Sequence, residues 1–240
     1  MSMKQARINQ LPPLDYNGAE ALNSICTNLT FTGRNLKRIL ITSNDPADGK
    51  SWLTIHIAVN LAERGRRVLL IDADLRRSFM VQRYKLEFED NRGLGLAHYL
   101  SGQCSLDECV YETDKFGMCI IPAGRDVTNP VSLMDTPYFA EMLTELANHF
   151  DLILLDAPPI GAVIDAAGIA ACCDGTVLVV AHKKTRLRDI AECKRQLEHS
   201  GTPVLGCIIN KVTFSSISEK KYYNRTYYRH YQRSYERTEE

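Results

Sequence analysis

The chain has 240 residues, of which 45% are hydrophobic, and its formal net charge is zero with a pI near 7.0. A chain of this length and hydrophobic content can bury one sizeable core, which favours one α/β domain over two small ones. The balanced charge gives no overall field for a polyanion, so we expect no nucleic-acid partner. The N-terminus lacks the apolar segment of a secretory signal, and no apolar run approaches the about 18 residues that span a bilayer. We therefore expect a cytoplasmic protein.

Eight cysteines lie mostly inside apolar segments, and none has the paired spacing with histidine that is typical of a zinc site. Cys104 and Cys109 are separated only by a loose C-x4-C gap. We interpret the cysteines as reduced, buried thiols in preference to a disulfide or zinc framework.

The first 18 residues contain two prolines and a glycine, and we predict an arm that lies on the domain or is left loose. Residues 19–31 follow with apolar side chains at helical spacing, which predicts a helix. Gly33 is the expected end of that helix.

A candidate phosphate-binding loop comes next. The β-branched run of residues 39–42 predicts a buried strand, and residues 52–64 have the amphipathic pattern of a helix. Between them stands Gly49-Lys50-Ser51, in the strand, loop and helix context that such a loop requires. The general motif has glycine where this chain has Asn44, but asparagine is the non-glycine residue that best tolerates positive φ. The alternative is an ordinary corner in which Gly-Lys-Ser occurs by chance.

In this interpretation, backbone N–H groups at the helix start face the phosphates of a nucleotide. Lys50 would reach the β- and γ-phosphates, and the Ser51 hydroxyl would serve a Mg²⁺ ion. The predicted nucleotide-binding residues are therefore Asp45, Pro46, Ala47, Asp48, Gly49, Lys50, Ser51 and Trp52.

The rest of the chain alternates strands and helices. We predict strands at residues 67–71, 118–121, 151–155, 175–181 and 204–209, and helices at residues 138–149, 162–172 and 187–199. Residues 75–116 are predicted to be irregular, with short helical pieces near 94–100 and 106–111. This alternation predicts an α/β fold with a doubly wound, mainly parallel sheet.

Three aspartates stand at the ends of apolar strands: Asp72, Asp74 and Asp156. Open parallel sheets bind ligands beyond the carboxyl ends of their strands, where these residues would meet the phosphate loop. Phosphoryl transfer needs positioned phosphates, Mg²⁺ and a group that accepts the proton of the nucleophile, which these residues can supply. One such aspartate alone would more commonly be a helix N-cap or a turn residue, and it is the combination of three with a phosphate loop that favours a Mg²⁺–nucleotide site.

Several other residues leave two interpretations open. Arg76 and Arg77 would bind phosphate or substrate, or be solvated surface residues. Asp165 would sense the γ-phosphate or cap a helix. Asn210, at the end of the last strand, would face the base of a nucleotide or have no role in the site.

Residues 215–240 differ in character from the rest, because they have almost no aliphatic side chains. We predict a flexible C-terminal tail that follows a domain of residues 1–214. Six of the eleven tyrosines lie in it, and they are the candidate phosphoacceptors: Tyr222, Tyr223, Tyr227, Tyr228, Tyr231 and Tyr235. From Glu219 onward there are six Lys or Arg and four Glu, so phosphorylation at several sites would reverse the charge of the tail. Alternatively, the tail binds a partner or a membrane surface without being modified.

Taken together, these residues resemble the bacterial tyrosine kinases of capsule and exopolysaccharide systems, of the type with a separate cytoplasmic kinase domain. Residues 42–51, which contain the phosphate loop, are similar to the family's T-S-x-x-P-G-x-G-K-S motif. Residues 69–76 match its apolar-D-x-D-x-R element, and residues 154–159 match its apolar-D-x-P-P element. The tyrosine cluster also fits. The resemblance implies the deviant Walker type of P-loop NTPase fold.

The resemblance further implies autophosphorylation of the tail tyrosines from Mg·ATP, largely between subunits, and hence a homo-oligomer. Lys50 would handle phosphate, Asp72 would be the base, and Ser51, Asp74 and Asp156 would serve Mg²⁺. The implied partners are a membrane-anchored activator of the polysaccharide co-polymerase type, which recruits the kinase to the inner face of the membrane, and a protein-tyrosine phosphatase.

The chain departs from the family pattern at some positions. Ala47 replaces a glycine, and Ser78 stands where proline often follows the arginine. Residues 20–26 read E-x-x-N-x-x-C in place of the family's E-x-x-R-x-x-R, whose arginines join neighbouring subunits in a ring.

Two other functions remain open at this point. One is a partition or septum-positioning ATPase switch, but that class has a lysine where this chain has Asp45. The other is a catalytically weak scaffold whose tail recruits partners.

Overall fold

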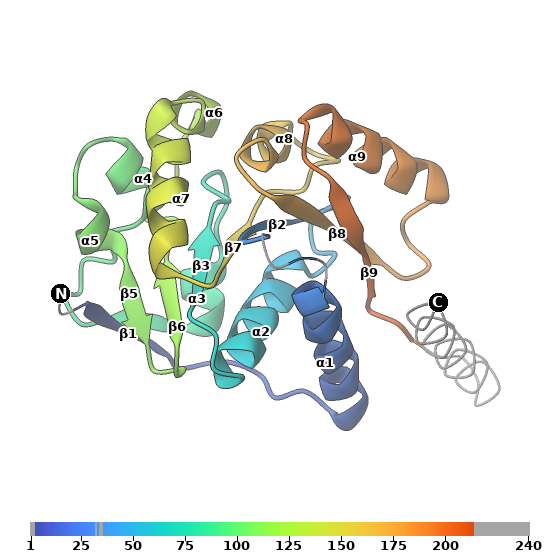
Figure 1. Cartoon of the computed structure of the whole chain (residues 1–240), viewed down its shortest axis with the longest axis horizontal. Coiled ribbons are helices and arrows are strands. Elements are labelled where there is room, and N and C mark those ends of the chain that lie inside the picture. Colours follow the sequence, from blue (N-terminus) through green and yellow to red (C-terminus); the bar gives the residue numbers. More distant parts are fainter. Residues whose placement is uncertain (1–2, 32, 34–35, 214–240) are drawn as a thin grey trace. The chain divides into compact units, whose positions relative to one another are not determined.

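One mixed sheet forms the centre of the computed structural model, which describes residues 3–31, 33 and 36–213 (Figure 1). Within these described residues, nine strands pair in the order β4-β1-β5-β6-β3-β7-β2-β8-β9. Their bounds in chain order are β1 Lys4–Ile8, β2 Arg38–Ser43, β3 Val68–Asp72, β4 Leu86–Phe88, β5 Tyr111–Thr113, β6 Met118–Ile121, β7 Leu152–Asp156, β8 Gly175–Ala181 and β9 Val204–Asn210.

Most neighbouring strands run parallel. The six strands from β6 to β9 in this order are all parallel to one another, and β1 is also parallel to β5. Only the pairs β1–β4 and β5–β6 are antiparallel among the described residues. The prediction of a mainly parallel sheet is therefore confirmed.

Helices cover both faces of the sheet, as a doubly wound fold requires (Figure 1). One face packs against α1 (Tyr16–Phe31), α2 (Lys50–Glu63) and α3 (Met80–Tyr84). The other face packs against α4 (Leu96–Leu100), α5 (Leu106–Cys109), α6 (Pro130–Met134), α7 (Pro137–His149), α8 (Asp165–Ala170) and α9 (Leu187–His199).

The composition of the central strands explains this arrangement. Successive side chains of a strand point to opposite faces of the sheet. In β3, Leu69 and Ile71 enter the core under α7, whereas Val68 and Leu70 enter the core under α2, and all four side chains are fully buried. A strand that is covered on both faces therefore appears in the sequence as a continuous apolar run.

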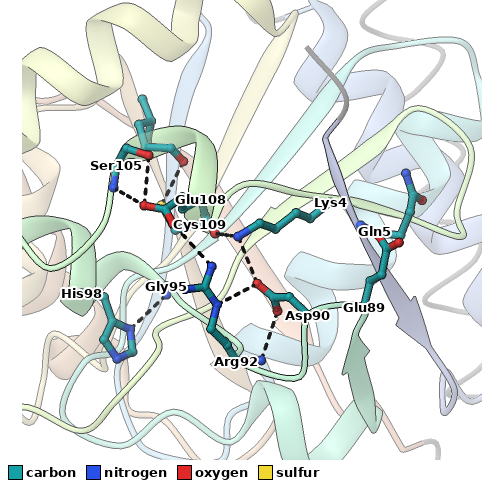
Figure 2. Close-up of polar contacts among 11 residues, drawn as sticks. Lys4, Gln5, Glu89, Asp90, Arg92, Gly95, His98, Ser105, Glu108 and Cys109 are labelled. Carbon is teal, nitrogen blue, oxygen red and sulfur yellow. Dashed lines mark hydrogen bonds and ion pairs between the residues drawn. The ribbon is translucent and has the colours of Figure 1, made fainter.

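The predicted N-terminal arm is wrong in one respect, because Lys4–Ile8 is a strand inside the sheet. It pairs with β5 on one side and with β4 on the other. At its start, Lys4 forms an ion pair with Asp90 (Figure 2), with 3.0 Å between the ammonium and a carboxylate oxygen. Only Ala6 and Ile8 of this strand are buried, so its sequence has too little apolar pattern to show that it belongs to a sheet.

The region predicted to be irregular, residues 75–116, contains more structure than expected. The helical pieces correspond to α4 and α5, but α3, β4 and β5 were not predicted. Each of these elements has five residues or fewer, which is too short for a reliable periodic pattern. Another short helix, α6, lies between β6 and α7, where no element was predicted, and Pro130 stands at its start.

The eight cysteines are free, and five of them are buried, as predicted. Within the described part of the chain, no helix is long and apolar enough to span a bilayer. The compact unit runs from Met1 to Asn210. The predicted tyrosine tail, residues 215–240, lies outside the described residues, and its role and the boundary before it stay predictions.

Candidate active site

The phosphate loop, residues 43–51, connects the carboxyl end of β2 to the first turn of α2. Its backbone takes two left-handed conformations, at Ala47 with φ 64° and at Gly49 with φ 99°. Asn44 does not adopt positive φ; its side-chain oxygen accepts a hydrogen bond from the Cys193 thiol at 3.1 Å. The left-handed residue is instead Ala47, where the family has glycine. This conformation is about 1 kcal/mol less favourable for alanine, so Ala47 destabilises the loop relative to glycine.

The three predicted aspartates come together at the same edge of the sheet. Asp72 and Asp156 are direct partners in the register of β3 and β7, and Asp74 follows two residues later. The ammonium of Lys50 lies 3.2 Å from a carboxylate oxygen of Asp74, 3.8 Å from one of Asp156 and 3.2 Å from the Ser51 hydroxyl. Parallel neighbouring strands end side by side, and this places acids that are distant in sequence around one lysine.

The electrostatics of this group are unusual. Burial and the neighbouring Asp156 raise the pKa of Asp72 to about 7, although the Ser78 hydroxyl donates a hydrogen bond to its carboxylate. Burial also raises the pKa of Asp156, although Lys50 counteracts this rise. Burial opposes the charge of Lys50, but Asp156 and Asp74 outweigh it and raise the pKa of the lysine. The site thus holds several buried acids around one cation.

The donor set fits a Mg²⁺ ion. One oxygen of Asp156 is buried and has no hydrogen-bond partner, and Ser51 and Asp74 add a hydroxyl and a carboxylate nearby. Among the residues described, no cluster of three or more His, Cys, Asp or Glu side chains is placed to enclose a metal. Mg²⁺ does not need such a cage, since proteins usually hold it with one or two carboxylates together with phosphates and water.

Asn210, at the end of β9, contacts the phosphate loop directly. Its side-chain amide donates a hydrogen bond to the main-chain oxygen of Asp48 at 2.9 Å. The same nitrogen would lie 2.2 Å from a Cβ atom at position 49, so a larger residue there would displace the Asn210 amide from Asp48. Asn210 therefore lies at the predicted site, against the backbone of the loop.

The other predicted loop residues have different surroundings. The ring of Trp52 packs against His56 with 4.3 Å between centroids, at the start of α2. Pro46 and Ala47 are exposed in the turn. Asp48 is fully buried, and Asp45 is partly exposed; both are paired with Lys184, at 3.2 and 3.5 Å.

Contacts of Arg76, Arg77 and Asp165 bear on the alternatives left open for these residues. Arg76 forms a two-bond ion pair with Asp165, at 2.5 and 2.9 Å. Asp165 lies in the first turn of α8, whose cap position is Ile164, so it does not cap the helix. The guanidinium of Arg77 lies 5.2 Å from the centre of the exposed Phe79 ring, on the surface beside the site.

Sequence reasoning missed two residues of the site. Ser78 was noted only as a departure from the family, yet its hydroxyl bonds to Asp72. Lys184 was not recognised at all, because nothing local in its sequence indicates that β8 lies beside β2. The six tail tyrosines, Tyr222, Tyr223, Tyr227, Tyr228, Tyr231 and Tyr235, lie outside the described residues.

Comparisons with known proteins show which sequences this chain resembles. A family model described as an AAA domain matches residues 36–198. The tyrosine-protein kinase CpsD of Streptococcus agalactiae is 39% identical over 205 residues, which cover 85% of this chain and 88% of that protein.

Solved structures show the same fold. The kinase domain of the Escherichia coli tyrosine kinase ETK has a TM-score of 0.75 at 27% identity, covering 83% of this chain and 79% of that one. The septum site-determining protein MinD of Pyrococcus horikoshii, complexed with Mg-ADP, has a TM-score of 0.62 at 26% identity and covers 72% of this chain and 69% of that one. The chain belongs to the bacterial tyrosine-protein kinase family, because it is 39% identical to the streptococcal kinase over most of both chains and has the phosphate loop and the strand-end aspartates.

Proposed function

We propose that the chain is an ATP-dependent protein-tyrosine autokinase that phosphorylates its own C-terminal tyrosines and so regulates capsular or exopolysaccharide synthesis and export. The observation that carries this proposal is the meeting of Lys50 and Ser51 with Asp72, Asp74 and Asp156 at one edge of the sheet. The name of the streptococcal relative, a tyrosine-protein kinase, supports the same activity.

Positioning of the phosphates falls to the loop and to Lys50. Backbone N–H groups at the start of α2 point beyond the helix end, and they attract anions together with the helix dipole. Lys50 is held close to Asp74 and Asp156, and it offsets the negative charge that develops on the transferred group. In this role the lysine stabilises the transition state more than the bound ground state.

Asp72 is the proposed base for the phenol. The residue is buried, and its pKa of about 7 lies near the operating pH, which is the range in which a carboxylate accepts a proton efficiently. Its two oxygens accept hydrogen bonds from the Ser78 hydroxyl and, at 3.3 Å, from the main-chain N–H of Asp74. The incoming phenol would replace the serine hydroxyl, because the main-chain donor cannot rotate away.

Ser51, Asp74 and Asp156 are the proposed holders of Mg²⁺. The bound ion would neutralise charge on the phosphates during transfer. Lys50 contacts all three residues, so it holds them in place and balances their charge.

The proposed acceptors are the tyrosines of residues 222–235, presented by a second copy of the chain. Because several phosphates would reverse the charge of a slightly positive tail, the modification would act as a graded electrostatic switch. We further propose that a membrane-anchored activator recruits the cytoplasmic kinase to the inner face of the membrane, and that a protein-tyrosine phosphatase removes the phosphates.

The experiment is tyrosine labelling of the full chain with Mg·ATP, mixed with the cytoplasmic segment of its activator and read by mass spectrometry. We expect phosphotyrosine within residues 222–235, and Lys50→Met should abolish it because the phosphate-contacting cation is lost. Labelling that persists in Lys50→Met, or never appears with the activator present, would overturn the proposal. ATP hydrolysis that DNA or lipid stimulates, without labelling, would instead indicate the ATPase switch, which Asp45 argues against.

A further inference from the structure

The phosphate loop carries two carboxylates of its own, on Asp45 and Asp48. A loop that receives a polyphosphate would repel it if these charges were not balanced. Asp48 is also fully buried, and a buried carboxylate is unfavourable unless it is paired and hydrogen-bonded. The loop therefore needs a cation in addition to the lysine of its own motif.

Lys50 is not available for this task. Its ammonium lies among Asp74, Asp156 and Ser51, and none of its ion pairs within the described residues reaches Asp45 or Asp48. The cation comes from another part of the chain.

Lys184 supplies this charge from the turn between β8 and α9. Its ammonium lies 3.2 Å from one oxygen of Asp48 and 3.5 Å from a carboxylate oxygen of Asp45. Because β8 pairs with β2, the turn that follows β8 lies beside the loop that follows β2. The side chain of Lys184 is 52% exposed, so it remains in contact with solvent while it pairs with the loop.

Asp48 also forms hydrogen bonds with Asp45 in the loop and with Asn210 at the end of β9. Its second carboxylate oxygen accepts a hydrogen bond from the N–H of Asp45 at 2.9 Å, and its main-chain oxygen accepts one from Asn210 at 2.9 Å. Lys184, in the turn after β8, thus holds Asp48 by its side chain, and Asn210, at the end of the adjacent strand β9, holds the same residue by its main chain.

We propose that Lys184 is a positioning residue for nucleotide binding. It neutralises Asp48 and Asp45, holds the loop in its left-handed form, and so lets the loop accept a nucleoside polyphosphate. The inference rests on the proposed ATP binding, and it assigns to a residue outside the three motifs a share of the affinity for the phosphates.

The chain provides its own probe. Trp52 is the only tryptophan, and it follows the loop directly, so its fluorescence reports nucleotide binding without a label. We would titrate full-length wild type, Lys184→Ala and Lys184→Arg with Mg·ATP, Mg·ADP and adenosine. The matched control is Lys194→Ala, which removes an equally exposed lysine of α9 that pairs with Glu198.

We expect Lys184→Ala to bind Mg·ATP about tenfold more weakly than wild type, because the lost charge acts on the phosphates. The affinity for Mg·ADP should fall less, and the affinity for adenosine should equal that of wild type. Lys184→Arg should restore most of the affinity, and Lys194→Ala should match wild type. The difference between Lys184→Ala and wild type should shrink at about 1 M salt, where charges are screened over about 3 Å.

A double-mutant cycle tests the pairing itself. Asp48→Asn removes the carboxylate but keeps the oxygen that accepts from Asp45, so the loss caused by Lys184→Ala should be smaller in that background. The inference would be overturned if Lys184→Ala weakened the binding of adenosine as much as the binding of Mg·ATP. It would also be overturned if Lys184→Ala weakened Mg·ATP binding as much in the Asp48→Asn background as in wild type. Either result would mean that Lys184 has only a structural role.

The two proposals fail in different ways. If wild type binds and labels but Lys184→Ala binds Mg·ATP equally well, the inference alone is wrong. If wild type binds no Mg·ATP, the proposed function is wrong and the inference with it.

Discussion

Two charged clusters of this molecule differ in their balance of charge. The active-edge cluster consists of Lys50, Asp72, Asp74 and Asp156, and the N-terminal-edge cluster consists of Lys4, Asp90, Arg92 and Glu108, which Figure 2 shows. In the first, three carboxylates surround one lysine, and one buried oxygen has no hydrogen-bond partner.

The second cluster has matched charges. Lys4 and Arg92 both pair with Asp90, at 3.0 and 3.5 Å, and Arg92 also reaches Glu108 at 3.4 Å. These pairs tie β1 to the loop after β4 and to α5, and they leave Asp90 with a pKa below its usual value, because Lys4 and Arg92 outweigh its burial.

The difference separates a cluster that stabilises the fold from one prepared for a ligand. Excess negative charge in a buried site lowers the stability of the fold. Such charge is typical of functional sites, where carboxylates bind a cation or transfer a proton. Removing a carboxylate should therefore harm activity at one cluster and stability at the other. The following predictions test this contrast.

The largest effect is expected for Asp156→Asn. Loss of a proposed Mg²⁺ ligand should lower the initial rate of tyrosine labelling by at least about 100-fold. Because the change relieves repulsion among buried acids, the free energy of unfolding in urea should stay equal to that of wild type or rise. A variant that labels at the wild-type rate, or that is clearly destabilised, would remove the contrast between the clusters.

A smaller loss is expected for Gly49→Ala. The new methyl group would lie 2.2 Å from the amide nitrogen of Asn210, at a φ of 99° that alanine avoids. Affinity for Mg·ATP should fall about tenfold, measured by calorimetry. Gly65→Ala is the matched control, with φ 83° but no atom within 4 Å of the new carbon. It should cost about 1 kcal/mol of stability and leave the affinity unchanged.

The raised pKa of Asp72 predicts that the free energy of unfolding depends on pH. In the nucleotide-free folded protein its pKa is about 7, because of burial and Asp156, whereas the unfolded chain titrates near about 3.9. Between these values the folded state holds a proton that the unfolded state has lost, so rising pH lowers the free energy of unfolding. Compared with Asp72→Asn, wild type should lose more than about 1 kcal/mol across this window, measured by urea unfolding. A pH-independent difference would contradict the assignment.

The smallest effect is expected at the N-terminal-edge cluster. Asp90→Asn removes the charge that holds Lys4 and Arg92, and it should lower the free energy of unfolding by about 1 kcal/mol, since these pairs are partly exposed. Tyrosine labelling of the folded variant should match wild type. A loss of labelling without loss of stability would mean that this cluster also serves the reaction.

Much of the active-edge cluster was predictable because its signals are local. A continuous apolar run predicts a strand buried on both faces, and the residue after such a run stands at the edge where parallel sheets bind ligands. Asp72, Asp74 and Asp156 follow such runs, and Lys50 stands after a strand and a loop at the start of a helix, the context that a phosphate loop requires. The structure brings these predicted residues together.

The N-terminal-edge cluster gave no such signal. β1, β4 and β5 have five residues or fewer, and each is defined by main-chain pairing with a distant partner. Short strands without a clear alternation cannot be distinguished from loops by periodicity.

The sequence by itself determined the parallel α/β fold, the phosphate loop and the acids that face it, because each depends on a pattern of a few neighbouring residues. Only the tertiary structure decided that Lys4–Ile8 is a strand, that Ala47 rather than Asn44 takes the left-handed turn, and that Lys184 balances the charge of Asp48. Lys184 and Asp48 are 136 residues apart in the chain, and they meet because β8 pairs with β2. Charge balance in this site is a property of strand order, which no local pattern contains.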